Sequence, residues 1–536
     1  MALLSDKRIL AVAIESTYGT AVVPTGDQAL LCNSITVNPL KQTLLERNNI
    51  KGFMGNDPSV VASQQMTVDV ELEVSPGGDA SGSPAPGIAP RWGALLKACG
   101  FQEAVTAAPV TGTAQAGTTT TVTLAAGASA VDDFYSGLSV SLVSETGTAL
   151  APAVAGDKTT LKLATAVRDD SYLDETTLEV QHFAGSVLSA GDTLSSTTRV
   201  YLPAGNASTT VTLLGLYLEI TTGAATERRK ITSYDKTTCK CGLDKPLTAL
   251  PSGASTYKVK EITKVASFVG STGIVTFSSP LRFASILSTP YKIYTPRLIT
   301  NYSGSTKVAT FTPAVKNKPT ATSTYLINAN VKYTPVSSAQ ASVTLYFVLD
   351  GVLHSCTGAR GTVSFDFSNG ALPKAKFSMT GLVARYETGT VASVNFDSIV
   401  DPLAVNYANT KNLVVAGYAD TVMEKISIDV GNKIVHRNMP GMEQVLITGR
   451  SPKGAVTIEA VDPAVFDFLS LMQPTITPSG LLFAHGPVGN QVAFAMPNVE
   501  LSNPTYSDKD GVAMMGLDAK YLPQGSGNNE IAIICQ

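Results

Sequence analysis

Charged side chains are scarce in this sequence. Asp, Glu, Lys and Arg make up 15% of its 536 residues, against about 25% in an average soluble domain, while hydrophobic residues make up an ordinary 44%. The net charge of −3 provides no overall basic field that would attract nucleic acid. Thr, Ser, Ala, Gly and Val replace the missing charges, and this mixture favours sheets and turns. Low charge is also typical of surfaces that are buried between subunits.

Histidine, cysteine and long apolar runs are few as well. The four histidines and six cysteines are scattered, so we predict neither a metal cluster nor a disulfide-built scaffold. Cys239 and Cys241 form at most half of a metal site, and we interpret them as free thiols on a strand edge. No apolar run reaches the roughly 18 residues that a transmembrane helix needs, so we expect no membrane insertion.

Motifs for catalysis or cofactor binding are missing too. The chain contains no nucleophile elbow, Walker loop or dinucleotide fingerprint. No pair of carboxylates is singled out as a general acid and base. We therefore predict that the protein is not an enzyme and that it has no catalytic residues, no metal and no cofactor.

The composition changes along the chain. Residues 1–104 and 331–536 mix polar, charged and apolar segments, whereas residues 105–330 are rich in Thr, Ser and Ala. Short alternating stretches bounded by turn residues predict strands throughout this middle region. We interpret 105–330 as an insertion into a host domain, although a plain series of domains would look similar.

The middle region also repeats itself. Residues 229–259 match residues 297–327 at nine of 31 positions, and a weaker echo relates 124–138 to 202–216. We predict three small all-β modules, near 110–188, 189–262 and 263–330. One irregular β domain with a biased composition is the alternative.

The flanking regions look duplicated. Residues 65–74 alternate strictly and predict a strand, residues 90–100 predict a short helix that begins at a proline and ends at a glycine, and residues 362–382 predict a hairpin. The last 130 residues repeat the order of strand, arm, strand, helix and hairpin, with the helix expected over 462–472. The alternative is that this order is simply common among β-rich proteins.

Several segments, in this order along the chain, resemble phage tail tube (major tail) proteins: Glu15–Thr20, Ile35–Pro39, Arg91–Phe101, Tyr333–Pro335, Phe347–Gly351, Gly358–Gly361 and Leu372–Gly381. The resemblance covers residues 1–103 and 331–440 well and the last hundred residues loosely. It implies a mainly β fold with two tandem tube-like β-sandwich or rolled-sheet domains, each with a flanking short helix, plus the inserted modules. Tube domain 1 would comprise 1–104 and 331–408, and tube domain 2 would comprise 409–536.

The same resemblance implies a structural subunit of the virion tail, assembled in the host cytoplasm, whose stacked rings surround a channel through which double-stranded DNA passes into the host. Two tube-like halves suggest a trimeric ring with pseudo-sixfold symmetry, and a hexamer of chains is the alternative. A sliding sheath would clash with an outward insertion, so we expect a long non-contractile tail of the siphovirus type. Expected partners are other copies of the chain and the tail terminator, tape measure and tail-tip proteins.

Two sets of residues are candidates for functional roles. The resemblance assigns contacts between rings to the arm 40–61, with Leu44, Arg47, Asn48, Phe53 and Met54. We also expect the acidic strand face of Asp69, Glu71, Glu73, Asp366 and Glu459 to line the channel and keep DNA from sticking; an outer solvated face is the alternative. The competing function is a tail-tip or adhesin-type protein whose inserted modules contact host surface glycans.

Overall fold

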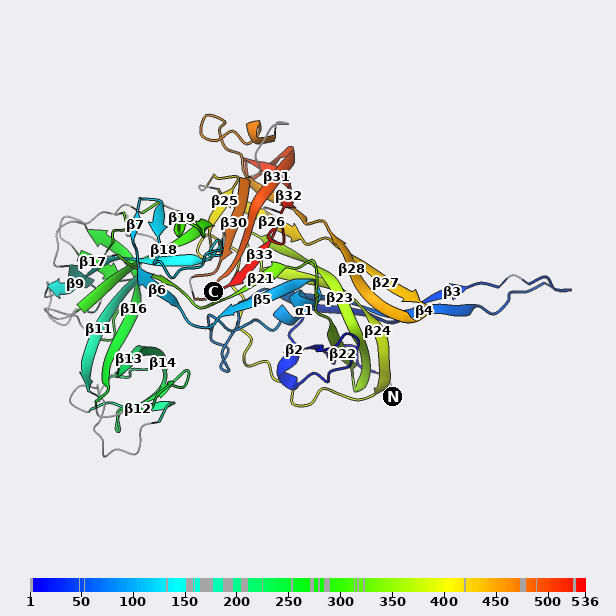
Figure 1. Cartoon of the computed structure of the whole chain (residues 1–536), viewed down its shortest axis with the longest axis horizontal. Helices are drawn as coiled ribbons and strands as arrows, with labels where there is room; N and C mark the ends of the chain where they lie inside the picture. Colours follow the sequence, from blue (N-terminus) through cyan, green and yellow to red (C-terminus); the bar gives the residue numbers. More distant parts are fainter. Residues whose placement is uncertain are drawn as a thin grey trace.

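The protein is mainly β, as predicted, in a computed structural model of the whole chain (Figure 1). The description covers all residues except 1–2, 48, 53, 132–133, 151–157, 159, 164–176, 187–195, 204–210, 224, 252–253, 270–273, 278–279, 284–289, 313, 316–317, 322, 419–420, 473–478, 488 and 524–526. Two large antiparallel sheets and one separate hairpin contain the described strands.

The first sheet takes its strands from both flanks of the chain. They are β1 (Arg8–Ile14), β2 (Ala29–Leu30), β3 (Ser34–Leu45), β4 (Val60–Glu73), β5 (Phe101–Thr106), β21 (Asn330–Pro335), β22 (Val343–Leu349), β23 (Val352–Ser368), β24 (Lys374–Thr388), β25 (Thr410–Val415), β26 (Met423–Asp429), β29 (Lys453–Glu459), β30 (Ser479–His485), β31 (Val492–Lys509), β32 (Val512–Leu522) and β33 (Ala532–Cys535). The predicted strand over 65–74 and the hairpin over 362–382 are confirmed as β4 and as β23 with β24.

Most of this sheet is built twice in the same way. In the first half, antiparallel neighbours follow the order β1, β22, β23, β24, β4 and β3. In the second half they follow β25, β30, β31, β32, β29 and β26. If the six strands of each half are numbered 1 to 6 in chain order, the order of neighbours in the sheet is 1-4-5-6-3-2 in both halves. The two halves therefore share one topology.

The two halves join directly through their backbones. β23 of the first half pairs with β26 of the second, with Ser364 opposite Asp429 and Phe365 opposite Ile428. Eight strands consequently form one continuous path, in the order β3, β4, β24, β23, β26, β29, β32 and β31.

Alternation decides which face of this path is buried. In β4, Val68, Val70 and Leu72 are 1–3% exposed, and the acidic residues between them point to the opposite side because successive side chains alternate. The apolar faces of both halves share one core, in which the rings of Phe365 and Phe494 pack edge to face at 5.0 Å.

The predicted first helix is confirmed, and the second is not. α1 (Gly93–Ala98) buries Leu95 and Leu96 completely, and Trp92 at its start donates a hydrogen bond of 2.9 Å to the carbonyl of Ser75. Over 462–472 the chain instead forms turns and a 3-10 turn, η3 (Ser470–Met472). A second 3-10 turn, η1 (Gly26–Gln28), precedes β2. Pro463 thus marks a turn, in which the Asp462 side chain accepts a hydrogen bond of 2.8 Å from the Ala464 N–H. The rings of Phe466 and Phe468 pack 4.7 Å apart in the segment that follows.

Each half carries a two-stranded arm at the same place in its topology. The first arm is the far end of β3 and β4, which projects from the molecule in Figure 1. The second arm is the separate hairpin β27 (Asn432–Met439) with β28 (Met442–Arg450), between β26 and β29. The second arm lies against the first half, because Arg360 donates a hydrogen bond of 2.9 Å to the carbonyl of Val445, which is fully buried.

The second sheet contains only strands from the inserted region. They are β6 (Val110–Thr113), β7 (Ala116–Gly117), β8 (Thr121–Thr123), β9 (Ser139–Leu150), β10 (Thr160–Leu163), β11 (Thr177–Ser186), β12 (Arg199–Tyr201), β13 (Tyr217–Thr222), β14 (Ala225–Asp235), β15 (Lys240–Leu243), β16 (Thr256–Val269), β17 (Ile274–Phe277), β18 (Pro290–Ser303), β19 (Val308–Thr312) and β20 (Thr324–Ile327). This sheet lies on the opposite side of the molecule from the first arm (Figure 1).

The sequence repeat corresponds to a structural repeat. β14 and β15 pair with a register shift between Ile231 and Ser233, and β18 and β19 pair with the same shift between Ile299 and Asn301, 68 residues later. One core contains Leu124 and Leu138 with Ile299, and a second contains the matching Leu202 and Leu216 with Ile231. The first of these cores therefore combines both ends of the insertion, which differs from a simple series of modules.

The insertion is docked on the second half of the main sheet. Leu138 and Tyr135 share a core with Leu482 and Ile534. The Ser139 backbone N–H donates a hydrogen bond of 2.8 Å to the Gln536 side chain, whose amide donates one of 3.0 Å to the Ser139 carbonyl. A side chain at Gly137 would collide with Ile534, because its Cβ would lie 2.4 Å from Cδ1.

Candidate functional site: a polar sheet face spanning both halves

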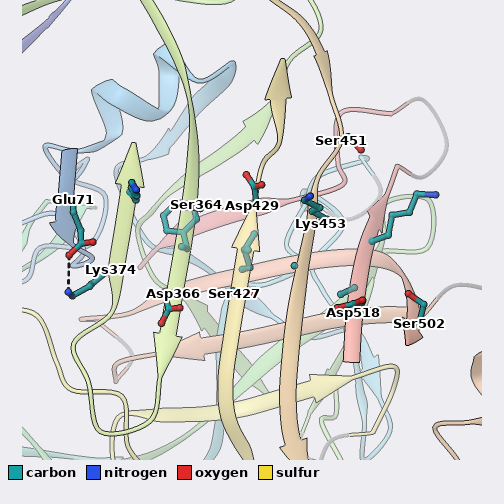
Figure 2. A pocket seen from close by; sticks show the side chains of 16 residues that line it. Glu71, Ser364, Asp366, Lys374, Ser427, Asp429, Ser451, Lys453, Ser502 and Asp518 are labelled. Carbon is teal, nitrogen blue, oxygen red and sulfur yellow. Dashed lines mark hydrogen bonds and ion pairs between the residues drawn. The ribbon is translucent and has the colours of Figure 1, made fainter. Parts of the chain in front are cut away.

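The face of the eight-strand path that points away from the core is polar across both halves. One row of directly paired residues crosses it from strand to strand: Glu71, Lys376, Ser364, Asp429, Lys453, Lys520 and Glu500. Paired residues project to the same side of a sheet, so the register alone places these side chains together. Figure 2 shows this face from close by.

The centre of this face is hollowed. Side chains from seven strands line an open depression of about 790 Å³, among them Glu71, Lys374, Asp366, Asp429, Lys453 and Asp518. Its lining alternates in charge, which distinguishes it from the largely apolar pockets that hold small molecules. The hollow is therefore a feature of a curved polar surface.

The structure brings the five predicted acidic residues to this one face. Cross-strand pairing aligns Glu73 with Lys374 and Asp366. Asp69 and Glu71 lie on the same face of β4 as Glu73, at every second position. Glu459 lies on the same side of β29 as Lys453, six residues away. Which surface of an assembly this face lines stays a prediction.

Lysines accompany these acids, a feature that the sequence interpretation missed. Glu71 pairs with Lys374 at 2.8 Å and Asp366 pairs with Lys425 at 2.7 Å. The hydrogen bond from the Lys374 ammonium to Glu71 raises the pKa of Lys374. The sequence could have shown these lysines, because Lys374, Lys376 and Ser378 stand at every second position of an alternating strand and so share its polar face.

Acids and bases are both frequent on this face. Cross-strand pairing places on it eight carboxylates, Asp69, Glu71, Glu73, Asp366, Asp429, Glu459, Glu500 and Asp518, and eight basic side chains, Lys41, Arg360, Lys374, Lys376, Lys425, Lys453, Lys509 and Lys520. The pairs are largely exposed, with Lys425 and Asp366 at 48% and 42%, so each contributes little to stability. Their main effect is a surface that is hydrated and on which acids and bases nearly balance.

The first arm exposes apolar side chains. Leu44 is 51% exposed and Met54 is fully exposed, and the same arm presents Leu45 and Ile50 to solvent. Arg47 is also exposed, whereas the predicted Asn48 and Phe53 lie outside the described residues. Exposed apolar groups gathered on one projecting element are typical of a contact surface.

The cysteines and the possible metal ligands lie apart in the described part of the chain. All six cysteines are free. Cys241 is buried in β15, where desolvation raises the pKa of its thiol to about 12, and Cys239 lies in the preceding turn with a positive φ of 54°, not on a strand edge. Among the described residues, no three His, Cys, Asp or Glu side chains gather as a metal site, and no helix is long and apolar enough to cross a membrane.

A duplicated antiparallel sheet with one polar face, one covered face and a projecting arm defines a mainly β protein. A family model described as phage tail tube protein matches residues 5–521, and the chain therefore belongs to the phage tail tube protein family. Its members are structural subunits that assemble into the tube of the virion tail, which supports the prediction that the chain is not an enzyme. No curated protein matches the chain.

Proposed function

We propose that three copies of this chain close into a ring with pseudo-sixfold symmetry, and that stacked rings surround a channel for double-stranded DNA. The observation that carries the proposal is the eight-strand path, which consists of two sets of four strands with the same topology. Closing such a path into a barrel also removes the open sheet edges that would otherwise aggregate.

The size of the barrel favours three copies. With strands about 4.8 Å apart and tilted by about 40°, 24 strands give a barrel roughly 48 Å across between backbones. Two copies give roughly 32 Å and six give roughly 96 Å by the same estimate. After side chains are subtracted, three copies leave a channel that admits a DNA duplex with a layer of water.

In this assembly the polar face lines the channel. Its carboxylates repel the phosphate backbone, and ion pairs such as Lys374 with Glu71 engage several of its lysines. A surface on which acids and bases are interspersed gives DNA no extended basic site at which to stop. The inserted region, 105–330, then decorates the outside of a long non-contractile tail, and the two tube domains comprise 1–104 with 331–408 and 409–536. Tail terminator, tape measure and tail-tip proteins bind the ends of the tube.

Electron microscopy of the purified full chain tests this function, together with the mass of a single ring. We expect stacked rings of three chains around a lumen of DNA width. Isolated subunits that form no ring at any concentration would contradict it.

The lining is tested separately by replacing Asp69, Glu71 and Glu73 with lysine in the phage. We expect slower DNA ejection, because the face becomes attractive to phosphate. The control replaces the exposed Asp397, which lies in a loop off this face, with lysine. Unchanged ejection in rings that assemble normally would show that another surface lines the channel.

A further inference from the structure

The eight-strand path ends in two unpaired edges. At one end, the segment 503–509 of β31 is paired only with β32. At the other end, β3 is paired only with β4. Exposed strand edges invite pairing with another chain, and both edges belong to the sheet whose polar face is described above.

The internal junction between β23 and β26 provides a template for joining these edges. By the shared topology, β31 occupies in the second half the position of β23, and β3 occupies in the first half the position of β26. The chain therefore already contains one copy of the junction that its two free edges lack.

The two halves are aligned where Val70-Glu71-Leu72-Glu73 of β4 matches Val456-Thr457-Ile458-Glu459 of β29, with an acid at the same place. Ile35 opposes Val70 as Ile426 opposes Val456, so Val37 corresponds to Ile428. Likewise, Val70 opposes Phe377 as Val456 opposes Leu517. Ser364 opposes Lys376, the residue before Phe377, and Thr505 opposes Gly516, the residue before Leu517. Ser364 and Thr505 therefore correspond to one another. Ser364-Phe365-Asp366 thus matches Thr505-Tyr506-Ser507, which has the same alternation of a small polar and an aromatic residue.

Burial differs sharply between the matched positions. Phe365 is 1% exposed and Ile428 is fully buried, where the internal junction is formed. Tyr506 is 65% exposed, and Val37 is only partly buried. Tyr506 is thus exposed and Val37 only partly covered at the free edges, although their counterparts lie in the core.

We infer that β31 of one copy pairs antiparallel with β3 of the next copy, in the register of the β23–β26 junction. The inference rests on the proposed tube function and specifies its interface. The expected pairs are Thr505 with Asn38, Tyr506 with Val37, and Ser507 with Thr36 of the next copy. Tyr506 and Val37 become buried together on the core side, and the polar face continues unbroken from one copy to the next.

The two arms support the same arrangement. The second arm packs against the first half through Val445, Arg360 and Tyr18, whose ring lies 4.8 Å from the Arg360 guanidinium. The first arm has no such neighbour within the described part of the chain, and it leaves Leu40 and Val61 about half exposed. In the ring, the base of the first arm lies against the second half of the neighbouring copy that supplies β31. This contact corresponds to the contact of the second arm with the first half within one chain.

Disulfide trapping tests the register in the full-length chain. Thr505→Cys with Asn38→Cys, in a Cys32→Ser background because Cys32 is only partly buried, joins copies on mild oxidation. The off-register control, Thr505→Cys with Thr36→Cys, places the thiols on the same face but two residues apart, beyond the roughly 3.5–4.5 Å Cβ separation that a disulfide allows. The internal pair Ser364→Cys with Asp429→Cys shows that the geometry of the template permits oxidation.

We expect the in-register pair to give a ladder of covalently joined chains at least tenfold more abundant than the off-register pair gives. Tyr506→Asp should also weaken association at least tenfold, while the exposed Tyr407→Asp should not. Rings that assemble with the in-register pair still reduced, while the internal pair oxidises, would overturn the pairing and leave the tube function standing. A chain that stays monomeric and never cross-links would overturn both.

Discussion

At the scale of single residues, Glu15 joins segments that lie far apart in the sequence. Its buried carboxyl accepts hydrogen bonds from the Ser342 and Thr344 hydroxyls at 2.6 and 2.9 Å, and from the Gly358 and Gly19 backbone N–H groups at 2.8 and 2.9 Å. These partners lie on three separate stretches of chain. One side chain therefore fixes the end of β1 against β22 and β23.

Replacing Glu15 with alanine should destabilise the tube domain by about 3 kcal/mol or more, because three buried donors and the partly buried Gly19 N–H lose their acceptor, at about 1–3 kcal/mol for each buried donor left unsatisfied. The control, Glu46→Ala, changes an exposed residue of the first arm. Chemical denaturation of both variants checks the expectation. Equal midpoints would mean that water replaces the lost acceptor.

Glu179 in the insertion makes a second buried network, and this one depends on pH. It lies 2.9 Å from Arg228 and 3.0 Å from Lys260. Burial by itself raises the pKa of the Glu179 carboxyl, but the two cations outweigh it and hold the pKa below its ordinary value. The ion pairs therefore stabilise the fold above the unfolded-state pKa of about 4.3, and this stability is lost as pH falls through the lower folded-state value.

Glu179→Gln should accordingly flatten the acid dependence of melting of the insertion between about pH 5 and pH 3. At neutral pH the variant should be less stable by about 3 kcal/mol, because Arg228 and Lys260 lose a buried partner. Thermal unfolding measured across this range tests both effects. A variant whose acid profile matches the parent chain would assign the pH dependence to other carboxylates.

At the scale of elements, the two arms show how one topology acquires two roles. The second arm ends near the first half and buries Val445 there. The first arm extends away from the body (Figure 1) and leaves Leu44, Ile50 and Met54 in solvent. Because exposed apolar groups gain free energy when a neighbour covers them, the free arm is the element best suited to contact a second ring.

Leu44→Asp with Met54→Asp should leave single rings intact and shorten or abolish stacked tubes. Two buried charges without partners would be costly at a contact between rings. Val131→Asp, at a residue of the insertion that is 63% exposed, is the matched control for adding charge to an exposed apolar position. Tube lengths in electron micrographs measure the effect, and long tubes from the double variant would exclude the arm tip from stacking.

At the scale of the whole molecule, the insertion is part of the folded body as well as an appendage. Its strands form a sheet of their own, yet Leu138 and Tyr135 share a core with Leu482 and Ile534 of the main sheet. Removal of the insertion therefore uncovers an apolar patch on the second half. That patch would be an aggregation site.

Deletion of residues 110–327 should thus give a chain that aggregates, whereas the same deletion with Leu482→Ser and Ile534→Ser should be soluble and form rings of smaller outer diameter. Light scattering and ring images distinguish the two. A soluble simple deletion would show that the docking contact contributes little to the folded state.

The sequence by itself determined the class of fold and much of the polar face. Strict alternation in 65–74 is enough to place Asp69, Glu71 and Glu73 opposite a row of buried valines and leucine, because the period of a strand is two residues. The duplication and the 68-residue repeat were also visible, since each copy keeps its own local pattern. The expected helix over 462–472 was wrong because capping signals there are shared by turns.

Tertiary structure alone decided how these parts meet. Local patterns carry no information on which strands become neighbours, so the junction of β23 with β26, the lysines that cross-strand pairing brings beside the acids, and the shared core of the insertion with Ile534 could not be predicted. Pairing between residues far apart in the chain is set by the sum of many weak contacts over the whole sheet. That sum leaves β3 and the end of β31 as the two free edges of this tail tube subunit.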